Sequence, residues 1–279
     1  MIGASRRSGT DGALGTLAAL SAPAAEHVQQ DQPPGVPALA LTGERTLPDV
    51  PAENYWFRRH LVVYRWIARR CGNLDVVDLA CGEGYGAAAL AEHAVTVVGV
   101  DANPEAHEHA RLKYRRPGLR FVRDLVETFA EPCDAVVFLQ TIEHVREPAA
   151  LLEHIRGLLR PGGVAYVSTP NVLTLAPVGA ERSDNPWHVY EYRADEFRAL
   201  CRQAFGSVEL FGLYHARKLR LHELALRTGW DRIHGRLGLT RPFYERFTPA
   251  IAEDDFRLRS ESDGADLDRA LDLLAVLRP

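Results

Sequence analysis

The chain has few of the features that define disulfide-rich, membrane-spanning or nucleic-acid-binding proteins. Its 279 residues include four cysteines, and no two of them form a Cys-x-x-Cys pair. Cys71, Cys81, Cys133 and Cys201 are therefore expected to be scattered core thiols in a reducing compartment, not a zinc or disulfide framework. No apolar run approaches the length of a membrane span, and a net charge of −4 does not favour nucleic acid. We expect a cytoplasmic protein without stable membrane insertion.

Composition and periodicity divide the chain into three parts. Residues 1–40 are rich in Ala, Gly, Pro, Gln and Ser and have no periodic apolar pattern, which predicts a disordered leader. Residues 41–73 form an N-terminal helical segment, because apolar side chains recur at helical spacing between Glu53 and Arg70. Residues 74–279 then form one main domain with a single substantial core.

Within the main domain, strand and helix patterns alternate along the chain. Alternation of this kind predicts an α/β fold, with a mostly parallel, seven-stranded sheet and helices on both faces. The expected strands are 74–79, 95–100, 120–122, 135–139, 164–168, 207–213 and 273–277, and the expected helices are 86–91, 104–115, 148–159 and 194–204.

An excursion at residues 214–268 precedes the last expected strand and is too long for an ordinary loop. It has a helical pattern around 219–228, and we expect either a lid over the substrate or a dimerisation element, which would make the protein a homodimer. Between Arg217 and Arg246, eight lysines and arginines outnumber three acidic residues, whereas 253–268 is acidic. This basic block is either an ordinary solvated surface or a rim that meets an anionic or bulky glycan.

Three glycines at alternate positions follow the first expected strand, in Val76-Val77-Asp78-Leu79-Ala80-Cys81-Gly82-Glu83-Gly84-Tyr85-Gly86. Glycine permits positive φ and close approach to a ligand, and the next helix directs free N–H groups at that ligand. A dinucleotide site has the spacing GxGxxG and binds a pyrophosphate, which Asp78 would repel. The same carboxylate can receive an ammonium group, so the spacing favours an adenosyl cofactor over a dinucleotide.

The glycine loop occurs together with Val98-Gly99-Val100-Asp101, Asp124, Glu143-His144-Val145, Pro161-Gly162-Gly163 and Ser168-Thr169-Pro170-Asn171. As a set, over about residues 47–213, these motifs resemble the class I S-adenosylmethionine-dependent methyltransferases. The resemblance implies a Rossmann-like class I methyltransferase fold and S-adenosylmethionine as cofactor. It implies close approach of the cofactor at Ala80, Gly82 and Gly84, ribose binding by Asp101, adenine contacts from Ala102, Asp124 and Leu125, and a methionine contact at Gln140.

Two histidines compete for the role of general base. Methyl transfer to oxygen needs an aligned acceptor, and a sugar hydroxyl is a poor nucleophile, so a histidine that removes its proton would accelerate the reaction. His144 follows the fourth expected strand, where Glu143 could orient it or bind the acceptor. His188 lies in a segment, Asn185 to Glu191, that should cross the mouth of the pocket. The sequence leaves both histidines open.

Glu143-His144 also resembles part of the metal-binding pattern of the O-methyltransferases of ubiquinone biosynthesis. Gln140 replaces the first acid of that pattern. We therefore expect no metal at this site.

The front segment indicates a class of acceptor. Residues 41–48 and 53–60, with Tyr64, are similar to the lead-in of bacterial methyltransferases of glycan synthesis, in particular the actinobacterial enzymes linked to methylglucose polysaccharide assembly. The resemblance implies that His60 and Tyr64 border the methionine end of the cofactor and that Arg58 or Arg59 meets its carboxylate. The alternative is that the aromatic residues of this segment only pack a helix on the sheet.

These observations predict an O-methyltransferase that acts on a sugar hydroxyl of a glucan or related oligosaccharide, as in methylglucose polysaccharide biosynthesis. Three alternatives remain: methylation of a quinone-like or other small hydroxylated metabolite, a non-catalytic subunit that binds the cofactor, and an NAD-dependent oxidoreductase. If the protein is an O-methyltransferase, its expected partner is a carbohydrate or another hydroxylated small molecule.

Overall fold

The computed structural model describes residues 28–41, 45–177 and 180–279. Most of the expected leader, residues 1–27, lies outside the described residues, as do residues 42–44 of the front segment. Within the described ranges, no helix combines the length and apolar character needed to cross a membrane.

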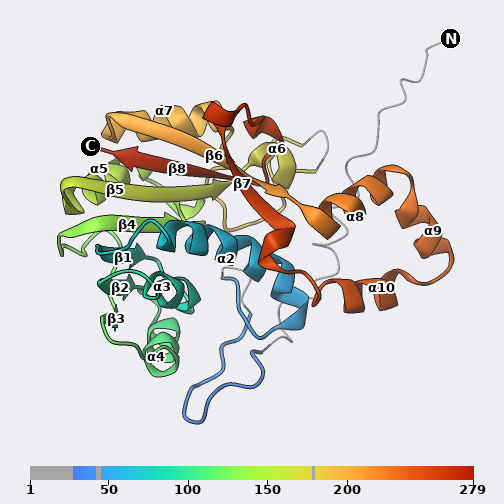
Figure 1. Ribbon diagram of the computed structural model, residues 1–279, viewed down its shortest axis with the longest axis horizontal. Helices are drawn as coiled ribbons and strands as arrows, with labels where there is room; N and C mark the ends of the chain where they lie inside the picture. The colour runs from blue at the N-terminus through green and yellow to red at the C-terminus, as the bar shows by residue number, and fades with distance from the viewer. Residues whose placement is uncertain (1–27, 42–44, 178–179) are drawn as a thin grey trace.

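An eight-stranded sheet forms the centre of the molecule, in the order β3-β2-β1-β4-β5-β8-β6-β7 (Figure 1). Its strands are β1 (Asp75–Leu79), β2 (Thr96–Val100), β3 (Leu119–Val122), β4 (Cys133–Leu139), β5 (Leu159–Pro170), β6 (Ser207–His215), β7 (Phe256–Ser260) and β8 (Asp272–Arg278). The five strands from β1 to β5 pair in parallel, and β8 is antiparallel to both β5 and β6. The Rossmann-like, mostly parallel arrangement is thus confirmed.

The sheet has one strand more than the sequence predicted. Strand β7 lies inside the excursion and pairs with β6 in antiparallel register, with Phe211 opposite Ser260. Its sequence, Phe256-Arg257-Leu258-Arg259-Ser260, alternates apolar and charged residues, as expected for a strand with one buried face. The acidic residues on both sides of this short segment concealed the pattern.

Helices cover both faces of the sheet, as predicted. They are α2 (Asn54–Ala68), α3 (Tyr85–Leu90), α4 (Pro104–Lys113), α5 (Pro148–Leu158), α6 (Val172–Leu175) and α7 (Ala194–Ala204). Successive residues of β4 point to opposite faces: Val136 belongs to the same core cluster as Phe197 of α7, and Val137 to the same cluster as Ile67 of α2 and Leu90 of α3. The two cores fix the central strands, whose carboxyl ends carry the motifs.

The segment at residues 28–41 corrects the predicted boundary of the leader. Its Gln29 donates its backbone N–H to the carbonyl of Leu39 at 3.1 Å and its side-chain amide to Glu83 at 3.0 Å. Leu39 and Leu41 are buried in a small cluster with Leu47 and Val50. Residues 28–40 are therefore packed on the domain through irregular contacts, which leave no periodic signal in the sequence.

The excursion contains three helices before β7: α8 (Arg217–Arg227), α9 (Trp230–Arg236) and α10 (Thr240–Phe247). We call residues 217–247 the arm. Figure 1 shows the arm extending from the body at the end of the sheet where β5 ends and β8 begins. The side-chain amide of Asn54, at the start of α2, donates to the carbonyls of Thr248 and Ile251 and fastens the base of the arm.

Candidate functional site

The glycine loop after β1 has a backbone that requires glycine for two different reasons. Ala80, Gly82 and Gly84 have φ of 56°, 55° and 98°. A Cβ added at Gly82 would meet no atom within 4 Å, so this position faces open space, as expected where a ligand approaches. A Cβ at Gly84 would lie 2.8 Å from the Cβ of Ala110 and 3.1 Å from the ring of Phe121. Packing thus accounts for glycine at 84, and the approach of a cofactor at this position stays a prediction.

Asp101 joins the end of β2 to the glycine loop. One carboxylate oxygen accepts from the N–H of Gly82 at 2.8 Å, and the other accepts from the N–H of Asn103 at 2.9 Å. Asp101 is half-buried, and Ala102 beside it is exposed. The residues predicted to bind ribose and to border adenine therefore lie next to the open position at Gly82.

Asp78 is fully buried at the end of β1 and is only partly satisfied. Its Oδ1 accepts from the hydroxyl of Tyr64 at 3.2 Å, whereas Oδ2 has no hydrogen-bond partner within the described structure. Burial raises the pKa of this carboxyl to about 8. A buried carboxylate oxygen without a partner is costly, and an ammonium group is the partner that would ionise and satisfy it.

The front segment is placed differently from the prediction. Arg59 is buried and donates through Nε and Nη2 to both carboxylate oxygens of Asp272, at 2.7 and 2.6 Å. The guanidinium of Arg59 already forms a two-point ion pair with Asp272 on β8. This internal ion pair takes the place of the contact that was predicted between Arg59 and the carboxylate of the cofactor. Arg58 forms an ion pair with Glu253. His60 lies 3.4 Å from the hydroxyl of Tyr85, and burial lowers the pKa of its imidazole to about 4, which keeps it neutral.

The other predicted cofactor residues follow β3 and β4. Asp124 caps its own turn, because its Oδ1 accepts from the N–H of Leu125 and the hydroxyl of Thr128. Leu125 is exposed. Gln140 has a φ of 52°, and its backbone N–H and side-chain amide both donate to the hydroxyl of Ser168. A left-handed residue directly after a central strand is a typical feature of functional sites.

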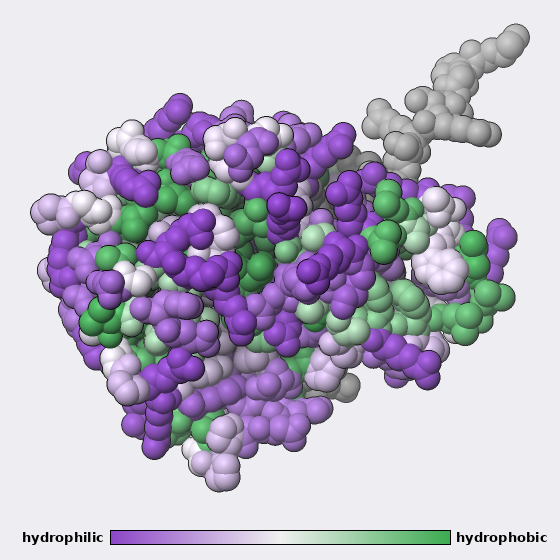
Figure 2. All heavy atoms as spheres, viewed as in Figure 1, coloured by the Kyte–Doolittle hydropathy of each residue, from purple (hydrophilic) through white to green (hydrophobic). Residues whose placement is uncertain are grey.

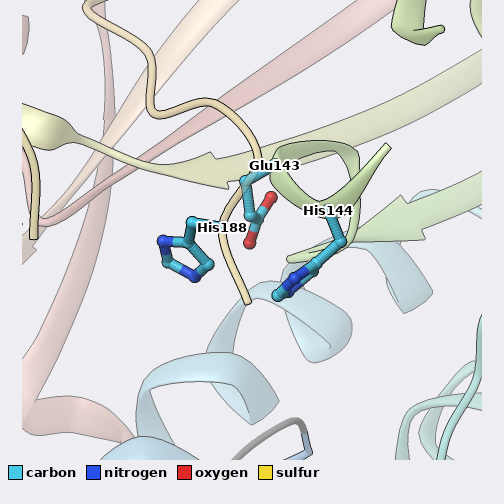
Figure 3. A group of neighbouring side chains, drawn as sticks. All are labelled: Glu143, His144 and His188. Carbon is cyan, nitrogen blue, oxygen red and sulfur yellow. The ribbon is translucent and has the colours of Figure 1, made fainter. Parts of the chain in front are cut away.

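The three predicted catalytic residues lie together (Figure 3). Glu143 and His144 belong to a short 3-10 helix after β4, and His188 comes from the irregular segment between α6 and α7. The rings of His144 and His188 meet edge to face, with centroids 5.0 Å apart. One possible ligand atom from each residue lies within 4.8 Å of the others. The donor types therefore suit a divalent cation as well as proton transfer.

Hydrogen bonds orient both histidines. Nδ1 of His144 lies 2.9 Å from the carbonyl oxygen of Trp187. Nδ1 of His188 lies 2.6 Å from a carboxylate oxygen of Glu191, and its Nε2 lies 3.0 Å from the side-chain nitrogen of Asn185. Because Asn185 Oδ1 accepts from the N–H of Trp187, its amide nitrogen donates to Nε2. His188 thus carries its proton on Nδ1, where Glu191 accepts it.

The acids beside the histidines differ in their environments. Although burial alone raises the pKa of Glu191, hydrogen bonds from Ser183 and His188 hold it below its usual value. Glu143 is buried, one of its carboxylate oxygens has no partner within the described structure, and burial raises its pKa to about 8. Its backbone carbonyl accepts from the N–H groups of Val189 and Tyr190. Glu143 thereby fixes the segment that carries His188.

Sequence reasoning missed the role of Glu83, which lies between two glycines of the loop. It is buried, and its carboxylate accepts from Lys113 at 2.8 Å, from Tyr114 at 2.7 Å and from Gln29, and also contacts His109 at 2.9 Å. The available signal for this role was a carboxylate flanked by two glycines. Sequence reasoning treated Glu83 only as a member of the loop, whereas its partners lie on α4, directly after α4 and in the segment 28–41.

A parallel sheet with a glycine-rich turn after β1 and a carboxylate after β2 defines an α/β domain that binds a nucleotide-type cofactor. Comparison with protein families then identifies the cofactor. The profile described as "Methyltransferase domain" matches residues 44–220, and the chain belongs to this family. It is an S-adenosylmethionine-dependent methyltransferase, and the unpartnered oxygen of Asp78 and the open face of Gly82 fit that cofactor.

Relatives agree with this assignment, and a solved structure shows the same fold. A protein of Mycolicibacterium smegmatis called a "Probable S-adenosylmethionine-dependent methyltransferase" is 40% identical, over 87% of this chain and 96% of its own. One from Mycobacterium tuberculosis with the same description is 37% identical, over 91% and 96%. The structure of an S-adenosylmethionine-dependent methyltransferase from Mesorhizobium loti has the same fold (TM-score 0.52, 18% identity), over 79% of this chain and 98% of that chain.

A partial match extends to another methyltransferase. The ubiquinone biosynthesis O-methyltransferase of Xylella fastidiosa is 36% identical over 116 residues, which cover 38% of this chain and 47% of that protein.

Proposed function

We propose that this protein transfers the methyl group of S-adenosylmethionine to a hydroxyl group of a sugar in a glucan or related oligosaccharide. The observation that supports the proposal best is the cluster of Glu143, His144 and His188 between the end of β4 and the segment before α7. Strand β4 neighbours β1, which carries the glycine loop. Glu143 and His144 therefore follow the strand next to the one that carries the loop, which supports a role of the cluster in the transfer.

The cofactor is assigned to the residues at the ends of β1 to β4. In this assignment Asp101 binds the ribose hydroxyls beside the open face of Gly82, and the unpartnered oxygen of Asp78 receives the ammonium group. Asp124 and Leu125 border the adenine. Gln140 presents its backbone to the methionine portion, near the short helix of the histidine cluster. Methyl transfer is an in-line displacement, so the main contribution of these residues is alignment.

We assign the general base to His188, because a carboxylate orients its ring. A base held by a third group through its other nitrogen is the arrangement used in catalytic triads. Glu191 accepts from Nδ1 of His188, which leaves the lone pair of Nε2 for a proton and stabilises the imidazolium that forms. To accept a proton from the acceptor, Nε2 exchanges the amide of Asn185 for the substrate hydroxyl. His144 packs against the ring and positions it.

Aromatic side chains near the cluster favour a carbohydrate acceptor. Trp187 is 50% and Tyr190 is 43% exposed, and both flank His188 in the chain. Exposed aromatic rings beside a polar cluster can stack on the apolar face of a sugar ring. By contrast, Tyr55 and Tyr64 of the front segment are buried in the core, which supports the packing interpretation for these two residues.

The second candidate is O-methylation of a quinol or another small phenol. The partial match to the ubiquinone biosynthesis enzyme supports it. The aromatic ring of such an acceptor would stack on Trp187 or Tyr190 just as a sugar ring would.

A panel of acceptors separates the two candidates. The protein is incubated with labelled S-adenosylmethionine and matched series of glucosides, gluco-oligosaccharides, quinols and catechols. We expect label on the saccharides, with turnover reduced in Trp187→Ala and little changed in the control Trp230→Ala, since Trp230 lies in the arm. Label on phenols alone would refute the carbohydrate assignment and leave the methyltransferase activity in place.

A further inference from the structure

The arm exposes a group of large apolar side chains. Twelve such side chains are exposed in the described part of the chain, and five of them lie in the arm. They are Leu221, Leu224, Ile233, Leu237 and Leu239, with exposed fractions between 48% and 68%. Figure 2 shows hydrophobic surface along this projecting region, where the rest of the visible face is largely hydrophilic. The clustering distinguishes these residues from the isolated apolar side chains of an ordinary surface.

These side chains are not part of the packing inside the arm. The arm has its own core, in which the ring of His222 contacts the rings of Phe243 and Phe247. Helix α8 turns Leu219, His222 and Leu226 inward. Leu221 and Leu224 lie on its opposite side at a spacing of three residues, which places them on one outward stripe. The arm thus has a packed core of its own, and this stripe of apolar side chains faces away from that core.

The arm is also rich in basic residues. Residues 217–246 contain eight lysines and arginines against three acidic residues, an excess of five positive charges. Four of the basic side chains are neutralised in ion pairs, for example Arg227 with Glu223 and Arg241 with Glu245. The remaining four form no ion pair with any described residue, and they are Arg220, Arg232, Arg236 and Arg246.

We propose that the arm is a peripheral docking surface for anionic lipid membranes. Exposed leucines next to unneutralised arginines are the combination that holds an amphipathic surface at the headgroup boundary without spanning the bilayer. The leucines enter the boundary, and Arg232 and Arg236 contact lipid phosphates. Because the arm starts at the carboxyl end of β6, next to the edge with the cofactor motifs, docking brings the site close to the membrane.

The charge of the arm favours an anionic membrane over a second copy of the chain as the partner of this surface. In a two-fold symmetric contact through the arm, identical surfaces meet, so the unneutralised arginines of one copy would approach those of the other. An anionic bilayer offers opposite charge over the whole surface. The inference is independent of the acceptor that the enzyme methylates.

Co-sedimentation of the full chain with vesicles tests the proposal. We expect binding to vesicles of phosphatidylcholine with phosphatidylglycerol, weakening as salt is added, and no binding to phosphatidylcholine alone. Arg232→Gln with Arg236→Gln should reduce affinity about fivefold per arginine. Leu221→Gln with Leu237→Gln should reduce binding to the anionic vesicles at every salt concentration. Matched controls outside the arm are Arg115→Gln and the exposed apolar Val95→Gln, which should bind like wild type.

Far-ultraviolet circular dichroism and methyl transfer to a soluble acceptor check that each variant is folded, since the arm has no catalytic residue. Equal binding to neutral and anionic vesicles, or none to either, would overturn the proposal. So would a concentration-dependent dimer, seen by analytical ultracentrifugation, that Leu221→Gln with Leu237→Gln dissociates, because a second copy would then be the occupant of this surface.

Discussion

Replacing Asp78 by Asn should stabilise the cofactor-free protein and weaken cofactor binding. The carboxyl group is fully buried, and one of its oxygens has no partner among the described residues. Without the cofactor, its charge is a liability for folding. With the ammonium group of the cofactor beside it, the same charge becomes a binding contact. The substitution removes both effects at almost constant volume, so stability and affinity should change in opposite directions.

The pKa of Asp78 gives the size and sign of the stability effect. Burial raises it from 3.8 to about 8, so the unfolded chain loses this proton at lower pH than the folded protein. The native state is therefore favoured by Asp78 below about pH 4 and loses that advantage as pH rises through 8. At about 1.4 kcal/mol per pH unit, the penalty at pH 7 reaches roughly 4 kcal/mol. Asn does not ionise, so the variant should gain up to this amount.

Urea unfolding of both proteins at pH 5 and pH 8, with Asp184→Asn as an exposed control, measures the difference. The advantage of the variant should grow between the two pH values, while the control follows wild type. Calorimetric titration with S-adenosylhomocysteine, which keeps the ammonium group, should show a loss of about tenfold or more, as expected for a charged hydrogen bond. An unchanged affinity would refute the ammonium assignment. A variant less stable than wild type at pH 8 would refute the buried-charge argument.

Four further predictions address the catalytic cluster, the cofactor and the framework. His188→Ala should lower kcat by about two orders of magnitude or more and keep the affinity for S-adenosylhomocysteine, whereas His144→Ala should have a smaller effect; equal turnover in wild type and both variants would exclude a histidine base. Asp101→Ala should weaken S-adenosylhomocysteine binding at least tenfold in calorimetry, since a charged contact to the ribose is lost. Chelation with EDTA followed by gel filtration should leave turnover unchanged, and a loss that Mg²⁺, Mn²⁺ or Zn²⁺ restores would make the histidines metal ligands. Arg59→Met should lower the free energy of unfolding by about 3–5 kcal/mol in urea, because Asp272 is left buried without its partner, and adding Asp272→Leu should recover most of that loss.

Sequence periodicity predicted most of the fold, because the central elements bury a face and therefore show a regular pattern. Helices α2 and α7 and strands β1, β2 and β8 begin and end within two residues of the predicted limits. Strand β7 was missed because five residues between acidic flanks give a weak pattern. Residues 28–40 were predicted to be part of a disordered leader. Side-chain contacts to Glu83 and backbone turns hold them, and neither kind of contact leaves a periodic pattern in the sequence.

The position of some candidate residues was predictable from the sequence, whereas their roles stay predictions. Asp101 follows a parallel strand, which predicts that it lies at the carboxyl edge of the sheet, and its carboxylate accepts from the N–H of Gly82 in the glycine loop. A residue with several uses needs its neighbours. Arg59 had a plausible partner in the cofactor, and only the fold brings Asp272, which is 213 residues away in the sequence, within 2.6 Å of its guanidinium.

Gly82 and Gly84 are a second case in which the sequence alone could not distinguish the environments of two residues. Both have positive φ, and their sequence surroundings are nearly identical, but only Gly82 has open space where a Cβ would be. The residue between them explains the difference. Glu83 points into the protein and is held by Lys113 and Tyr114 of the α4 region, so the loop is fastened on that side, where Gly84 packs, and Gly82 is left facing outward. If the proposed cofactor assignment holds, a backbone already fixed at Gly82 would align the cofactor with little loss of freedom on binding, and the buried contacts of Glu83 hold the loop beside that position.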